Sequence, residues 1–118
     1  MKTLVFFIAL AMGSAALAHA PVGRCSLDGQ TVNCEGRYDD GTRADGVTVS
    51  VITYDGETLH TQVLDRASRF QFALPTRPFY VLMDAGPGEM FEMDWRDIRG
   101  MSETRFETEK AAEAPAYR

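Results

Sequence analysis

The chain has 118 residues, enough for one small domain, and its 12 basic and 17 acidic residues give a net charge of −5. This acidic balance argues against nucleic acid and anionic membrane surfaces as partners. It is compatible with a bound cation, although solubility alone explains it equally well. The sequence has no recognisable nucleophile–base pair, phosphate-cradling glycine loop or zinc-hydrolase histidine set, so we expect no enzymatic activity.

Residues 1–18 have the pattern of a secretory signal peptide. Lys2 precedes an apolar run over residues 4–10, and small residues follow up to Ala18. The apolar run is far shorter than the roughly 20 residues that a membrane-spanning helix needs. We therefore predict an exported, periplasmic protein whose mature chain does not insert into a membrane.

Two cleavage sites satisfy the requirement for small residues at positions −3 and −1, one before His19 and one before Pro21. Signal peptidases generally avoid proline directly after the cut, because proline lacks the N–H and the backbone freedom of other residues. We therefore favour His19 as the first mature residue. A lipid anchor on Cys25 is not expected, because Arg24 stands where a small residue would be required. The mature chain then carries 11 basic and 17 acidic residues, a net charge of −6.

The two cysteines of an exported chain, Cys25 and Cys34, are predicted to form one structural disulfide. A hairpin that turns on Gly29 and Gln30 has glycine first, as a type II′ turn prefers, and sets the cysteines directly opposite each other. They then form a non-hydrogen-bonded pair, where the two backbones approach most closely. A turn on Asp28 and Gly29, with diagonal cysteines, and a redox or metal-thiolate role are the weaker alternatives.

Residues 19–100 contain six or seven short strand patterns separated by glycine and proline turns. No segment has the pattern of a core helix, so we predict an all-β fold, a small antiparallel β-sandwich. The tail, residues 101–118, is charged and poor in aliphatic residues, which predicts a frayed helix or disorder.

Side-chain alternation predicts which residues face the core. A three-residue loop at 55–57 would also bring Leu59 and Val63 to the inward face and leave His60 on the polar face. The apolar run at residues 79–85 predicts a central strand buried on both sides. The inward positions predicted from alternation are Val47, Val49, Val51, Phe70, Phe72, Leu74, Phe91, Met93 and Trp95.

Several motifs occur in a familiar order: an N-terminal histidine of the mature chain, a hairpin, then "DGVTVSV", "DGETL", "RFQF" and "VLMDAGPGEMFEMDW". Over about residues 18–98 this order resembles the small exported β-sandwich proteins that accompany bacterial nickel and cobalt uptake systems. The resemblance implies a transthyretin-like, carboxypeptidase-regulatory-like sandwich that binds nickel or cobalt and serves a membrane transporter component. Where that family carries a histidine after "DAGPG", this chain has Glu89.

Four residues are candidate metal ligands: His19, His60, Glu89 and Met90. As the first mature residue, His19 would offer its α-amine and imidazole to one metal, and imidazole suits nickel, cobalt, copper and zinc. His60 is the only other histidine of the chain, and a solvated surface histidine is its alternative role. Met90 is predicted to point outward beside Glu89, and because thioethers select Cu(I), copper is the chemical alternative to nickel and cobalt.

The leading hypothesis is therefore a periplasmic protein that binds a transition-metal ion for uptake or homeostasis, with a transporter component as a possible partner. The alternative is a non-catalytic interaction module of the cell envelope, which would present its loops or an edge strand to another protein. Intact-mass analysis of the exported protein would show whether His19 is the first residue.

Overall fold

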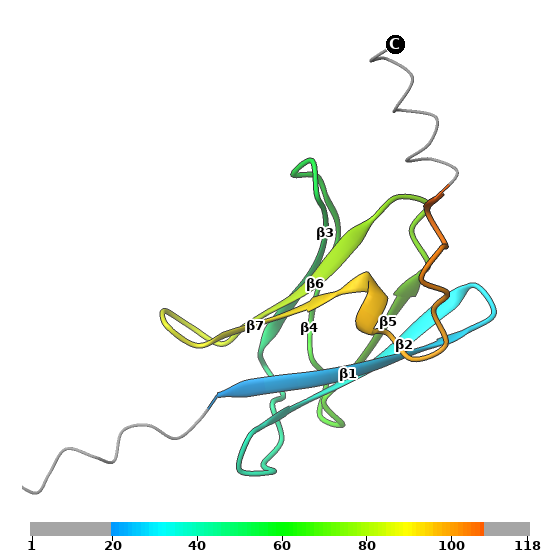
Figure 1. Cartoon of the computed structure of the whole chain (residues 1–118). Helices are drawn as coiled ribbons and strands as arrows, with labels where there is room; N and C mark the ends of the chain where they lie inside the picture. The colour runs from blue at the N-terminus through cyan, green and yellow to red at the C-terminus, as the bar shows by residue number, and fades with distance from the viewer. Residues whose placement is uncertain (1–19, 108–118) are drawn as a thin grey trace, which may run out of the picture.

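The computed structural model describes residues 20–107, which form a two-layer β-sandwich (Figure 1). Sheet A is antiparallel with the order β1 (Pro21–Asp28), β2 (Thr31–Tyr38) and β5 (Arg69–Ala73). Sheet B is antiparallel with the order β4 (Thr58–Val63), β3 (Thr48–Thr53), β6 (Phe79–Asp84) and β7 (Met90–Asp94). A short 3-10 helix, η3 (Trp95–Asp97), follows β7. The predicted fold class is confirmed.

The signal peptide predicted for residues 1–18, the candidate ligand His19 and residues 108–118 lie outside the described residues. Within residues 20–107, no helix has both the length and the apolar character required to span a bilayer.

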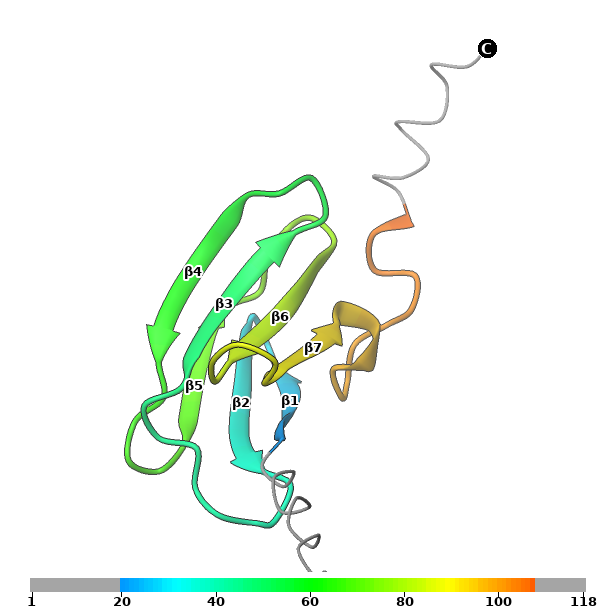
Figure 2. The ribbon, with the colours of Figure 1, turned by 90° about the vertical axis from the view of Figure 1, so that its left-hand side faces the viewer.

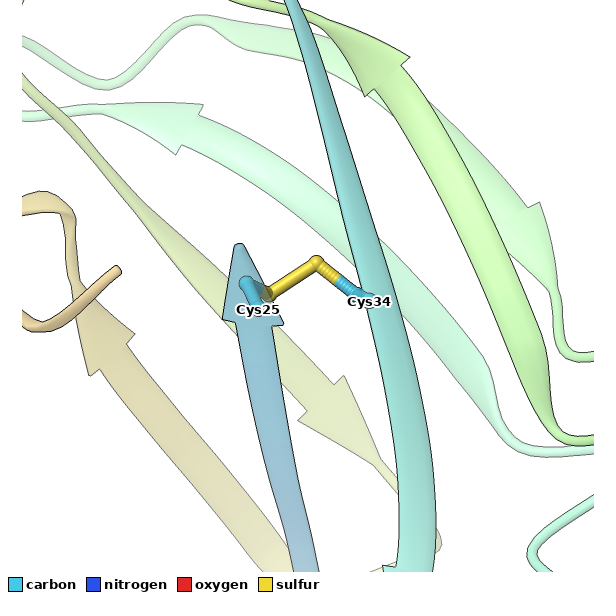
Figure 3. Close-up of a disulfide and its surroundings, with 2 residues drawn as sticks. All are labelled: Cys25 and Cys34. Carbon is cyan, nitrogen blue, oxygen red and sulfur yellow. A yellow bond between two sulfur atoms is a disulfide. The ribbon is translucent and has the colours of Figure 1, made fainter. Parts of the chain in front are cut away.

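The β1–β2 hairpin has the predicted register and the predicted disulfide (Figure 3). Asp28 pairs with Thr31, and Cys25 lies directly opposite Cys34, with 4.0 Å between their Cα atoms. Gly29 has a φ of +65°, the left-handed conformation that the first position of a type II′ turn requires. The bond closes a short local loop and stabilises the hairpin by about 2–3 kcal/mol, chiefly by restricting the unfolded chain.

The core lies between the two sheets and contains most of the side chains that alternation placed there. Val49 and Val51 are fully buried, and Phe79 meets Phe72 edge-to-face with 5.9 Å between ring centroids. Phe91 is only partly buried. The other predicted core residues are buried, which confirms the strand faces of Val47, Phe70, Leu74, Met93 and Trp95.

The register predicted for β4 was wrong. A β-bulge between Val51 and Ile52 shifts the pairing, so that Val51 lies opposite His60. His60 therefore shares the inward face with the valines, and Val63, opposite Thr48, is 56% exposed on the outer face. Leu59 is the extra residue of the bulge, is 39% exposed and borders the cleft beside His60. Because side chains alternate with a period of two, this one-residue shift moves the side chains of residues 60–63 to the face opposite the predicted one.

β6 is a central strand of its sheet, as predicted, but it is not buried on both sides. Its residues alternate between buried and partly exposed, with Val81 and Met83 in the core and Tyr80 and Leu82 on the outer face. The outer face of sheet B has no covering layer among the described residues, which is the reason for the difference.

The packed structure continues past the predicted domain boundary at residue 100. Phe106 is only 6% exposed and meets Trp95 edge-to-face, with 4.8 Å between ring centroids. The backbone of Arg99 also bonds with β1, accepting from the Leu27 N–H and donating to the Cys25 carbonyl at 2.9 and 3.0 Å. The first part of the predicted tail is thus part of the folded domain.

The two sides of the sandwich differ (Figure 2). On what we call the closed side, β1 packs against β7, and residues 95–106 run back over this part of the molecule. On the open side, β4 and β5 are the neighbouring edge strands of the two sheets and make few contacts with each other. Each side contains part of the predicted ligand set.

Candidate functional site

The chain enters the sandwich beside an acidic loop. The N–H of Ala20, the first described residue, donates to a carboxylate oxygen of Asp39 at 3.3 Å. The N–H of Asp39 donates in return to the Ala20 carbonyl at 2.8 Å. This reciprocal pair holds the backbone next to position 19 at the acidic end of β2. Asp39 was not among the ligands predicted from the sequence, although an Asp-Asp-Gly sequence directly after a strand was the available signal.

The turn between β6 and β7 lies at the same end of the molecule as the start of β1 (Figure 1). The loop of residues 39–47 leads from the end of β2 to Thr48, which pairs with Asp84 at the end of β6, and Asp84 pairs with Met90 at the start of β7. Ser26 of β1 forms a parallel bridge with Arg99, so the segment after η3 runs in the same direction as β1.

Two predicted ligands, Glu89 and Met90, belong to this turn. Both are exposed, and Met90 is 56% accessible on the outer face of sheet B, as predicted. The turn is held by the Asp84 carboxylate, which accepts from the N–H of Gly86 at 2.9 Å, and by the Ala85 N–H, which donates to the Glu89 carbonyl at 2.9 Å. The turn has a complete structural explanation and also presents a carboxylate and a thioether to solvent.

His60 lies far from that end. It is on β4, whereas Met90 is on β7, the opposite edge of sheet B, and three strand spacings of about 4.8 Å separate these edges by about 14 Å. The pairing places His60 level with Val51 and Val81 in the middle of the strands. His60 therefore does not share a site with Glu89 and Met90.

The His60 side chain makes its contacts with neighbouring side chains on the open side. Its Nε2 is 3.0 Å from the amide oxygen of Gln62, and its ring lies 6.3 Å from that of Phe72. It borders a cleft of about 350 Å³ between β4 and the end of β5. The floor of this cleft is apolar, with Val51, Phe72 and Leu74 among its residues.

A wider open groove of about 1050 Å³ runs along sheet A. The register places Arg24, Glu35 and Arg69 in one row across its three strands, facing away from the core. Glu35 is paired with Arg37 at 2.5 Å, so the row is largely self-compensated. This surface has the character of a solvated sheet face and presents no concentrated charge to a ligand.

One polar contact joins distant parts of sheet B. The Tyr54 hydroxyl donates to the Asp94 carboxylate, which also accepts from the N–H and the guanidinium of Arg96. Partial burial, followed by the hydrogen bond to Asp94, raises the pKa of Tyr54 to about 12. Partial burial opposes ionisation of Asp94 most strongly, yet the bonds from Tyr54 and Arg96 together keep the pKa of Asp94 below its ordinary value. The contact is structural, because Asp94 also caps the first turn of η3.

A second polar cluster lies at the tip of the β3–β4 hairpin. Arg77 forms ion pairs with Asp55 at 3.2 Å and Glu57 at 2.5 Å. The hydrogen bond from the Thr53 hydroxyl is the main cause that lowers the pKa of the exposed Asp55. These ion pairs connect the hairpin tip to the loop before β6, so we interpret the cluster as a structural surface contact and not as a ligand site.

Among residues 20–107, no group of three or more histidine, cysteine, aspartate or glutamate side chains is arranged to hold a metal ion. No protein-family model, curated protein or solved structure matches the chain. The likeness to nickel and cobalt accessory proteins stays a prediction from the sequence motifs.

Proposed function

We propose that the protein is a periplasmic metal-binding protein that holds a transition-metal ion at its mature N-terminus. The α-amine and imidazole of His19 would form the chelate. The observation that carries the proposal is the reciprocal hydrogen bonding between Ala20 and Asp39, because it fixes the chain one residue from His19 beside a carboxylate. Nitrogen donors joined by a carboxylate suit nickel, cobalt, copper and zinc.

The placement of the other predicted ligands supports a narrower donor set than the sequence suggested. Glu89 and Met90 lie at the end of the sandwich where β1 begins, whereas His60 lies on the open side. The candidate donors are therefore His19 first, with Asp39, Glu89 or Met90 completing the coordination. The acidic net charge of the chain is compatible with a cation as cargo.

The uncharged histidine imidazole and a neutral terminal amine are both required for the chelate, so binding must release protons at neutral pH. A preformed anchor also lowers the entropic cost of ordering the N-terminus around the metal. Both arguments apply only if export leaves His19 as the first residue, so intact mass and N-terminal sequencing of the exported protein come first.

Isothermal titration of the mature chain with Ni(II), Co(II), Cu(II) and Cu(I) tests the proposal. We expect one ion to bind in a one-to-one complex and the binding to be abolished by one additional residue ahead of His19. Asp39→Asn and Glu89→Gln should each weaken binding, whereas His60→Ala is the matched control and should not. Failure of all four ions to bind, or equal binding to the N-terminally extended chain, would contradict the proposal.

The second candidate function is a non-catalytic interaction module, and the open side supports it. β4 is an edge strand with two exposed apolar side chains, Leu59 and Val63. Sheet edges of this kind recruit additional strands through their main-chain hydrogen-bonding groups. This candidate does not compete with metal binding, because the two features lie on different sides of the sandwich.

A further inference from the structure

The cleft on the open side reaches the apolar core. It lies between β4 and β5, the neighbouring edge strands of the two sheets, which make few contacts with each other. Its lining includes Val51, which is fully buried, and Phe72 and Leu74, which are 5% and 8% exposed. The volume of about 350 Å³ falls within the range of roughly 300–1,000 Å³ that small-molecule sites occupy.

The β-bulge adds an apolar wall to this cleft. The pairing with β3 passes from Thr58 directly to His60, so Leu59 is the extra residue of β4. The Leu59 side chain lines the cleft and is 39% exposed. Bulges are common beside functional sites, because they re-aim a side chain. A ligand in the cleft would cover Leu59 and remove apolar surface from water, which favours an apolar ligand.

Two aromatic rings meet in the lining of the cleft. The rings of His60 and Phe72 lie 6.3 Å apart with 31° between their planes, and Phe72 also contacts the ring of Phe79 edge-to-face. Aromatic rings attract one another in offset and edge-to-face arrangements by more than their buried area provides. The lining therefore favours a ligand with an aromatic ring over an aliphatic molecule of the same size.

The His60 ring offers one hydrogen-bond acceptor. Its Nε2 is 3.0 Å from the amide oxygen of Gln62, which can only accept, so Nε2 carries the hydrogen. In the neutral imidazole the other ring nitrogen, Nδ1, is then an acceptor. Within residues 20–107 the contact with Gln62 is the one side-chain hydrogen bond of this ring. A ligand hydroxyl or N–H group would supply a donor to Nδ1.

The charges at the mouth of the cleft disfavour an anionic ligand. Arg77 is the one permanently charged side chain in the lining, and it is paired with Asp55 at 3.2 Å and Glu57 at 2.5 Å. Two carboxylates thus face one guanidinium, and their excess negative charge would repel a ligand carboxylate. A charged ligand of either sign would also lose its hydration on the apolar floor. The site therefore fits an uncharged molecule.

We propose that this cleft binds a small uncharged aromatic molecule that carries one hydroxyl or N–H group, as phenol and indole do. The ligand ring lies against Phe72 and Leu59, and its donor meets Nδ1 of His60. The cleft contains none of the candidate metal ligands Asp39, Glu89 and Met90, so the two proposals can be tested separately.

Backbone amide NMR of the mature chain, titrated with phenol, tests the proposal. We expect saturable shift changes centred on the cleft, at residues 59, 60, 72–74, 76 and 77. The matched probes are anisole, which lacks the donor, cyclohexanol, which lacks the aromatic ring, and benzoate, which carries a negative charge. Each should bind at least about threefold more weakly than phenol, because each lacks one of the features that the lining recognises.

Two variants separate the parts of the site. His60→Phe keeps an aromatic ring but removes the acceptor, so it should weaken phenol binding at least about threefold and leave anisole binding unchanged. Leu59→Asp places a carboxylate in the cleft and should weaken the binding of both at least about tenfold. Val63→Asp, on the exposed outer face of the same strand, is its matched control. Shift changes that do not saturate or that lie elsewhere, benzoate or cyclohexanol binding as strong as that of phenol, or an undiminished preference for phenol in His60→Phe would overturn the proposal.

Discussion

The closed and open sides of the sandwich differ in how firmly their strands are held. On the closed side, a disulfide joins β1 to β2, Arg99 hydrogen-bonds the edge of β1, and Phe106 packs on Trp95. On the open side, β4 is an edge strand of sheet B, contains a bulge and borders a cleft. Under the proposed function, the rigid side would anchor the metal-binding N-terminus, whereas the open side would offer an edge strand to a partner.

Removing Phe106 should be the most damaging of the changes considered. Phe106→Ala deletes a buried aromatic side chain and should lower the free energy of unfolding by about 3 kcal/mol or more, as measured by urea denaturation. Leu59→Ala, on the open side, should cost less than about 1 kcal/mol because that side chain is 39% exposed. Equal losses in the two variants would remove the contrast between the sides.

Removing the disulfide should have the next largest effect. The double variant Cys25→Ala with Cys34→Ala should lose about 2–3 kcal/mol of stability, because its unfolded chain is no longer restricted. For a domain of this size, that corresponds to a fall in Tm of roughly 10–20 °C. Calorimetry of the oxidised protein and the variant gives both values, and an unchanged Tm would show that the hairpin does not depend on its covalent bond.

Metal affinity should depend on pH if the N-terminal chelate is correct. The imidazole, with an ordinary pKa near 6.5, and the terminal amine, near 7.7–8.0, must both lose their protons to bind. Affinity should therefore fall by more than about tenfold between pH 8 and pH 6, as measured by titration calorimetry in the same buffer series. Binding that does not change over this range would indicate a carboxylate site instead.

The contact between Tyr54 and Asp94 should have the smallest effect, because the Tyr54 side chain is 58% exposed. Tyr54→Phe should cost about 0.5–1 kcal/mol after allowance for solvent screening. Since the pKa of Tyr54 is raised to about 12, its contribution is present below the ordinary value near 10 and is lost as pH rises from 10 to 12. Ultraviolet titration should show one late-ionising phenol that Tyr54→Phe removes; a late phenol that persists would contradict the assignment.

Asp94 leads to a prediction for the stability of the protein at acidic pH. Its pKa is lowered, so its contribution to stability is present above its ordinary value and is lost as the pH falls through the lowered one. Asp94→Asn should therefore flatten the acid limb of the stability profile. The alkaline limb, governed by the Tyr54 phenol, should also change, because the acceptor of its bond is altered.

The sequence predicted the closed side well because local signals determine it. The register of the β1–β2 hairpin follows from two local features: a glycine at the first turn position, and two cysteines placed symmetrically about the Gly29-Gln30 turn. Neither feature depends on the rest of the chain. The alternation of Val47, Val49 and Val51 likewise identified a core face correctly. These features depend on neighbouring residues and on a period of two, both of which can be recognised in the sequence.

The open side was predicted less well because its register depends on a bulge. Leu59 and Val63 alternate as core residues would, yet His60 and Gln62 face inward at the incompletely covered edge. No local pattern reports an extra residue in one strand of a pair. The roles of Asp39 and Phe106 were missed for a related reason, since both depend on contacts between segments far apart in the sequence.

Paramagnetic broadening of backbone amide NMR signals by bound Ni(II) or Co(II) tests the central claim most directly, because it reports which side of the sandwich the metal approaches. The account predicts that one equivalent of metal added to the mature chain broadens the amides of residues 20, 22, 23, 39–42, 86 and 88–90. The amides of residues 60–63 should stay sharp. Broadening centred on His60, or spread without preference over both sides, would contradict it.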